Sequence, residues 1–98
     1  MKITLKIDGK DKIFTTGFIS ARMVRKTIEI SQGTNFEEMS VDELDKLVGF
    51  IVELFGGQFT VDEVYDGLSS NELIPTTLKC IEEVVGKMQD ETKGDEKN

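Results

Sequence analysis

The stretch from residue 40 to residue 59 constrains the fold of this 98-residue chain more than any other. It starts with a capping box, in which the Ser40 hydroxyl accepts a hydrogen bond from the Glu43 amide and the Glu43 carboxylate accepts one from the Ser40 amide. Gly56 and Gly57 end it, because glycine adopts the left-handed conformation of a helix C-cap without a steric cost. The stretch therefore predicts one helix with both ends marked.

This central helix, predicted for residues 41–55, is apolar on nearly every side. Its apolar residues are Leu47, Val48, Phe50, Ile51, Val52, Leu54 and Phe55. A helix that is apolar all round must be covered all round. The sequence leaves two alternatives open: the rest of the chain wraps the helix, or part of it forms a groove or self-association surface for an apolar partner.

The N-terminal segment predicts a β-hairpin. Residues 2–7 alternate between apolar and polar side chains, as in a strand with one buried face. Asp8 and Gly9 form a dipeptide that is typical of a hairpin turn, and residues 12–16 supply the return strand. Two strands alone are marginally stable in water, so the hairpin is expected to pack on helices.

Two further helices have clear start signals. Ser20 is a predicted N-cap for a helix over residues 21–30, and Gly33 is its predicted stop. The apolar face predicted for this helix consists of Ala21, Val24 and Ile28. A second capping box, Thr60 with Glu63, starts a short helix that ends near Gly67, with Val61, Val64, Tyr65 and Leu68 facing inward.

The last predicted helix starts at Pro75, because proline suits the first helical turn and disfavours a helical residue before it. Its predicted apolar stripe consists of Leu78, Ile81, Val85 and Met88, broadened by Val84. Residues 89–98 contain no apolar side chain and are predicted to be a disordered tail. The expected fold class is therefore α+β: one globular domain at residues 1–88, in which an N-terminal hairpin packs on a bundle of about four helices.

The composition argues against several classes of function. The chain has 12 basic and 19 acidic residues, a net charge of -7 and a pI of about 4.5, which disfavours binding to nucleic acids and to anionic membranes. No apolar run approaches the length of a membrane-spanning helix, and the N-terminus lacks a signal-peptide core, so a cytoplasmic protein is expected.

The residues that carry enzyme chemistry are scarce. The chain has no histidine and one cysteine, Cys80, which removes the commonest general base and the usual zinc ligands. We expect Cys80 to be a buried, inert thiol. The acidic pairs at 42–43 and 62–63 stand at helix starts, where capping and the helix dipole account for them. No catalytic residue, metal site or cofactor is predicted.

A small basic cluster runs against the sign of the net charge. Arg22, Arg25 and Lys26 are spaced three and four residues apart, which places them on one face of the first helix. One interpretation is a solvated helix face whose charges pair with the protein's own carboxylates. The other is a patch for an acidic partner segment.

Three segments resemble the tail assembly chaperones of long-tailed phages, in the branch found in phages and prophages of Gram-positive bacteria. They are residues 18–25 (FISARMVR), 47–59 (LVGFIVELFGGQF) and 64–68 (VYDGL), and the resemblance covers roughly residues 1–88. It implies a protein that is not an enzyme. It further implies a chaperone that binds the long, helical tape measure protein in the host cytoplasm and keeps it soluble while tail tube subunits assemble, and that is absent from the mature virion.

On this basis the expected partners are the tape measure protein and, second to it, the tail tube protein. Formation of a homo-oligomer is also expected from the resemblance. In many relatives a ribosomal frameshift extends the C-terminus, and the polar tail is where such an extension would begin. We expect the partner-binding surface to use Phe50, Leu54 and Phe59, aided by Arg22 and Arg25.

The alternative is a small acidic regulatory adapter that binds a folded protein partner through its charged surface. The dependence of partner binding on salt concentration distinguishes the two functions. Binding through charge weakens steeply as the Debye length shrinks, whereas capture of apolar helices survives moderate salt.

Overall fold

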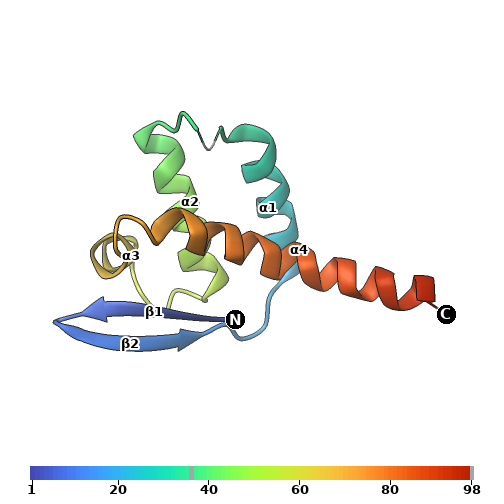
Figure 1. Ribbon diagram of the computed structural model, residues 1–98, viewed down its shortest axis with the longest axis horizontal. Coiled ribbons are helices and arrows are strands. Elements are labelled where there is room, and N and C mark those ends of the chain that lie inside the picture. The colour runs from blue at the N-terminus through green and yellow to red at the C-terminus, as the bar shows by residue number, and fades with distance from the viewer. Residues whose placement is uncertain (36, 98) are drawn as a thin grey trace.

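The computed structural model is an α+β protein and confirms the expected fold class. The hairpin strands β1 (Lys2–Ile7) and β2 (Lys10–Thr15) are followed by the helices α1 (Ala21–Gly33), α2 (Val41–Leu54), α3 (Val61–Gly67) and α4 (Leu73–Lys97) (Figure 1). The structure describes residues 1–35 and 37–97, and the side chains of residues 1–35 and 37–86. The disordered tail predicted for residues 89–98 lies outside the described side chains and stays a prediction.

The hairpin turn contains two residues, Asp8 and Gly9, and both have positive φ angles, 54° and 78°. Such turns match the right-handed twist of the flanking strands, which is why the Asp-Gly dipeptide favours them. The turn places Lys10 directly opposite Ile7, so β2 begins two residues earlier than the sequence predicts. Of the alternating residues of β1, Ile3 and Leu5 are buried and Ile7 is half-buried.

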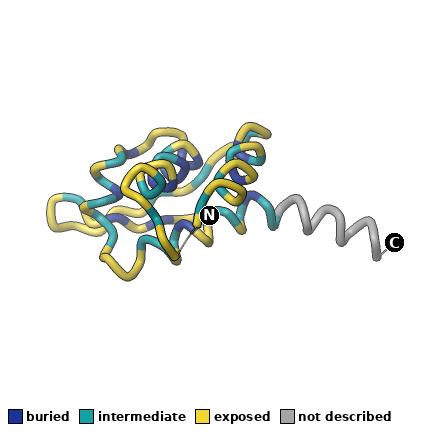
Figure 2. The backbone as a smooth tube through the Cα atoms, turned by 90° about the horizontal axis from the view of Figure 1, so that it is seen from above, coloured by how far each residue is buried: buried dark blue, intermediate teal, exposed yellow. Residues whose placement is uncertain are grey.

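Helix α2 lies at the centre of the core. Both ends are built as predicted: the capping box at Ser40 is complete, and the amides of Gly56 and Gly57 donate to the carbonyls of Glu53 (2.9 Å) and Val52 (3.0 Å). These two bonds form a Schellman motif, which satisfies carbonyls that the helix leaves unpaired. The buried apolar residues of α2 are Leu47, Val48, Phe50, Ile51 and Leu54. They lie on one broad face of α2 that the rest of the chain covers, so the first alternative holds for these five. The buried stretches of the chain lie at the inside of the folded part (Figure 2).

The buried face of α1 differs from the prediction. Met23 and Thr27 are buried, whereas Ala21 and Ile28 are exposed and Val24 is half-buried. The Thr27 hydroxyl donates to the Met23 carbonyl at 2.8 Å, so burying it leaves no polar group unpaired. Sequence reasoning that counts only aliphatic residues therefore missed the true face. Helix α1 ends at the predicted stop, Gly33, but it runs three residues beyond Ile30, the last helical residue predicted.

The buried face of α4 also differs from its predicted apolar stripe, and the physical reason is the same. Its buried residues among the described side chains are Thr77, Cys80 and Val84, of which Val84 was predicted. The predicted residues Ile81 and Val85 are half-buried, and Leu78 is 42% exposed. The Thr77 hydroxyl donates to the carbonyl of Leu73 at 2.9 Å, again within its own helix.

The start of α4 is also corrected, because the helix begins at Leu73 rather than at Pro75. Proline is tolerated there because the first four amides of a helix have no intrahelical acceptor, and Pro75 occupies one of those positions. The predicted stripe residue Met88 lies outside the described side chains.

Helix α3 joins the hairpin to α2. Its capping box at Thr60 is complete, and Val64 is buried while Val61, Tyr65 and Leu68 are half-buried, as predicted. The Tyr65 hydroxyl donates to Asp45 of α2 at 2.5 Å. Partial burial, followed by this hydrogen bond, raises the pKa of Tyr65 to about 12.

Candidate partner-binding surface

The acidic pairs serve the helix starts, as predicted. The Glu43 carboxylate accepts from the Ser40 amide at 3.2 Å, and the Glu63 carboxylate accepts from the Thr60 amide at 2.9 Å. Within residues 1–35 and 37–86, no three His, Cys, Asp or Glu side chains are grouped so that they could hold a metal ion. Cys80 is fully buried, as expected, and burial raises its pKa to about 12. A thiol that stays protonated is a poor nucleophile.

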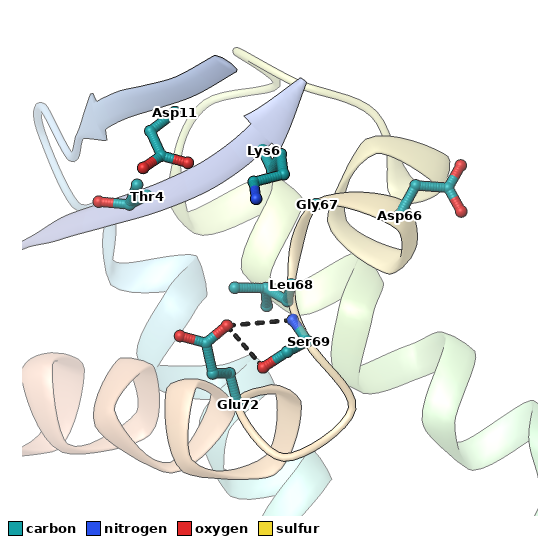
Figure 3. Close-up of a pocket in the computed structure, with 8 residues that line it drawn as sticks. All are labelled: Thr4, Lys6, Asp11, Asp66, Gly67, Leu68, Ser69 and Glu72. Atoms are coloured by element: carbon teal, nitrogen blue, oxygen red, sulfur yellow. Dashed lines mark hydrogen bonds between the residues drawn. The ribbon is translucent and has the colours of Figure 1, made fainter. Parts of the chain in front are cut away.

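A hollow of about 390 Å³ lies between the hairpin and the α3–α4 junction (Figure 3). It is lined by Thr4, Lys6, Asp11, Asp66, Gly67, Leu68, Ser69 and Glu72. The Glu72 carboxylate accepts from the Ser69 hydroxyl at 2.7 Å and from the Ser69 amide at 3.0 Å. These bonds, the hydroxyl first, lower the pKa of Glu72. The carboxylate thus stabilises the turn before α4.

The three cations of the basic cluster, Arg22, Arg25 and Lys26, differ in their ion pairs. Arg25 Nε pairs with Glu29 Oε1 one helical turn later at 3.1 Å, and Lys26 Nζ pairs with Glu53 Oε2 of α2 at 2.7 Å. Arg22 is exposed and has no ion pair within the described part of the chain. The solvated-face interpretation therefore holds for Arg25 and Lys26, and the role of Arg22 in partner binding stays a prediction.

The three apolar residues predicted to contact a partner lie in the core. Phe50, Leu54 and Phe59 are 2%, 3% and 3% exposed. The Phe59 ring packs edge-on against Phe14 of β2, with centroids 4.9 Å apart, and also against Phe55. In this fold the three residues belong to the hydrophobic core, and they reach a partner only where the core opens. Their role in binding stays a prediction under that condition.

The exposed apolar side chains lie elsewhere. Those exposed by more than a third are Phe18 (93%), Val41 (74%), Ile13 (66%), Ile28 (51%) and Leu78 (42%). Phe18 is the most exposed of these, and it stands in the connector between β2 and α1, four residues before Arg22. Sequence reasoning did not single it out as a contact residue, because a connector has no periodicity from which burial can be deduced.

The structure defines a class: a small α+β protein in which the described residues assemble no group of potential metal ligands. No described helix is both long enough and apolar enough to cross a membrane. The sequence pattern of the family described as phage tail chaperone protein matches residues 1–98. The chain therefore belongs to the phage tail chaperone family. Comparison with curated proteins and with solved structures gives no match.

Membership of this family confirms the resemblance and extends it over the whole chain. The family consists of chaperones that act during tail assembly, and they are not enzymes. Their role implies binding to tail proteins.

Proposed function

We propose that this protein binds the tape measure protein in the host cytoplasm and keeps it soluble until the tail tube subunits enclose it. Family membership over all 98 residues carries this proposal. The acidic surface supports it, because a net charge of -7 keeps a protein soluble while it carries an apolar partner. The chaperone is released before the virion is complete, and the tail tube protein is its second partner.

The surface around the start of α1 is the best candidate for the contact. Phe18 offers an aromatic ring that is 93% exposed, and aromatic side chains supply much of the energy of protein interfaces. Arg22 and Arg25 stand on the following helix, and Arg22 has no ion pair among the described residues that would have to be broken. An apolar helix with acidic residues at its margin fits this surface. Phe50, Leu54 and Phe59 support it from the core.

Co-expression with the tape measure protein of the same phage tests the proposal. The soluble fraction is analysed by size-exclusion chromatography with light scattering. Soluble tape measure protein that co-elutes with the chaperone supports the proposal, and the mass gives the stoichiometry. Tape measure protein that stays insoluble beside a free chaperone overturns it. Repeating the separation at high salt distinguishes helix capture from the charge-led adapter, because only the adapter complex dissociates steeply.

A matched pair of variants tests the surface. Phe18→Ser removes an exposed ring without disturbing the core, so we expect the melting temperature to stay unchanged and tape measure solubility to fall. Val41→Ser is the control, because Val41 is 74% exposed at the start of α2, away from the start of α1 (Figure 1). Equal solubility with both variants would show that the contact lies elsewhere.

A further inference from the structure

The outer edge of β2 presents main-chain groups that the fold leaves unpaired. The amide of Thr16 donates to the carbonyl of Met1 at 2.9 Å. Because hydrogen-bonded pairs alternate along an antiparallel ladder, the residues two and four positions earlier, Phe14 and Lys12, also bond to β1. The main-chain groups of Asp11, Ile13 and Thr15 therefore point outward.

Other parts of the chain cover the remaining edge positions. Gln58 Nε2 donates to the outward carbonyl of Thr15 at 2.9 Å. On the opposite edge, Gly67 of α3 lies so close to β1 that a Cβ built on it would stand 3.2 Å from both the amide nitrogen and the carbonyl oxygen of Lys6. Asp11 and Ile13 have no such cover within the described residues, and Figure 1 draws β2 at the margin of the molecule with no helix beyond it.

The hairpin carries a small excess of positive charge on an acidic protein. Residues 2–15 hold four basic and two acidic residues, and the β2 strand itself contributes Lys10, Lys12 and Asp11. The hairpin lysines Lys2, Lys6, Lys10 and Lys12 are all exposed. Lysines along an edge discourage pairing with a second copy of the same edge, because like charges would be brought together. The same lysines attract an acidic segment.

We infer that the edge of β2 is a binding site for an extended acidic segment of a protein partner, which adds to the hairpin as a third strand. The main-chain groups of Asp11 and Ile13 supply the hydrogen bonds, which give affinity in strand addition. Acidic side chains on one face of the segment lie beside Lys10 and Lys12. An apolar side chain on its other face lies beside Ile13, which is 66% exposed. This site is separate from the helix-capturing surface at Phe18 and does not depend on the proposed function.

Binding of a synthetic peptide tests the inference. The probe has about eight residues that alternate glutamate and valine, which is enough to span a strand of this length. Hydrogen exchange is followed by NMR. We expect the amides of Asp11 and Ile13 to exchange at least about tenfold more slowly with the peptide bound, while the amides of Lys12 and Phe14 are protected in both states. Absence of this selective protection overturns the inference. A peptide with lysine in place of glutamate, and one with N-methylated alternate amides, are both expected to fail to bind.

Substitution at one edge residue separates main-chain from side-chain effects. Ile13→Pro removes an outward amide and leaves the ladder to β1 intact, which is why proline is tolerated on edge strands. We expect it to weaken peptide binding at least about tenfold, whereas Ile13→Thr, which keeps the amide, weakens it less than about threefold. Reversal of the exposed charges in Lys10→Glu/Lys12→Glu is a second test that leaves the backbone unchanged, and we again expect a loss of at least about tenfold.

Three results would overturn the inference: wild-type affinity in Ile13→Pro, wild-type affinity in Lys10→Glu/Lys12→Glu, or a dimer of the free protein that Ile13→Pro dissociates. The last result would assign the edge to a second copy of the chain. None of these results depends on whether the tape measure protein becomes soluble, so this inference and the proposed function fail separately.

Discussion

Replacing Gly67 with alanine tests how closely the hairpin is seated on the helices. Gly67 is the last residue of α3, and its φ angle lies outside the left-handed region. Alanine is therefore compatible with the backbone conformation of Gly67. The effect of the substitution depends on whether there is room for the added Cβ. A Cβ at this position would stand 3.0 Å from the Leu5 Cβ and 3.2 Å from the main chain of Lys6. Neither neighbour moves freely, because Leu5 is fully buried and Lys6 is held in β1 by the ladder.

Two opposing effects determine how much Gly67→Ala changes the free energy of unfolding. Glycine to alanine in a helix normally stabilises a protein by about 0.5–1 kcal/mol, and less at a helix end. Overpacking a contact that cannot relax costs about 1–3 kcal/mol. We expect the cost of overpacking to exceed the gain in helix propensity, so that Gly67→Ala lowers the unfolding free energy by about 1 kcal/mol. For a domain of this size, that corresponds to a fall in melting temperature of about 4–8 °C.

Gly49→Ala is the matched control. Gly49 lies inside α2, and a Cβ built on it meets nothing within 4 Å. The same substitution should therefore raise the unfolding free energy there by about 0.5–1 kcal/mol. Thermal and urea denaturation followed by circular dichroism measure both variants. A Gly67→Ala protein as stable as the wild type, or more so, would refute the reasoning and show that the hairpin shifts on α3 without cost.

Three further predictions concern local structure. Cys80 is expected to resist thiol-labelling reagents in the native protein at pH 8 and to react at once in denaturant, because its buried thiol has a pKa raised to about 12; rapid native labelling would contradict this burial. Ser40→Ala and Thr60→Ala should each cost about 1 kcal/mol, measured by urea denaturation, because each removes a capping acceptor from a helix start. The lowered pKa of Glu72 means that its contribution to stability is complete above the unfolded pKa and is lost as the pH falls through the folded value; Ser69→Ala should raise that pKa toward 4.5 in an NMR titration, and an unchanged pKa would assign the shift to another cause.

The sequence predicted the parts of the fold that local chemistry decides. Both capping boxes, the Asp8-Gly9 turn and the Gly56-Gly57 helix end are as expected, because each depends on atoms within a few residues of one another. The buried faces of α1 and α4 were predicted only in part, for a different reason. Thr27 and Thr77 enter the core because their hydroxyls bond to their own helices, and a count of aliphatic residues ranks them as surface.

The candidate site was harder to predict than the fold. An apolar residue on a helix suggests either core or partner, and only the tertiary arrangement decides between them. The structure places Phe50, Leu54 and Phe59 in the core, whereas it leaves the connector residue Phe18 in solvent. The sequence could not predict the outward amide of Ile13 either. Which edge of a hairpin is covered depends on where α3 and Gln58 lie in the folded protein.

The completeness of the core bears on how such a chaperone would release its partner. Because the apolar side of α2 is satisfied within the fold, the apolar area offered to a partner consists of separate side chains such as Phe18, Ile28 and Leu78. Single exposed side chains bind weakly. Under the proposed function, several copies of the chaperone along one long partner would hold it by repeated weak contacts, and each contact would open independently as the tube advances. Under the proposed function, strengthening a single contact would therefore hinder assembly rather than help it, since the chaperone must be displaced by the tube subunits.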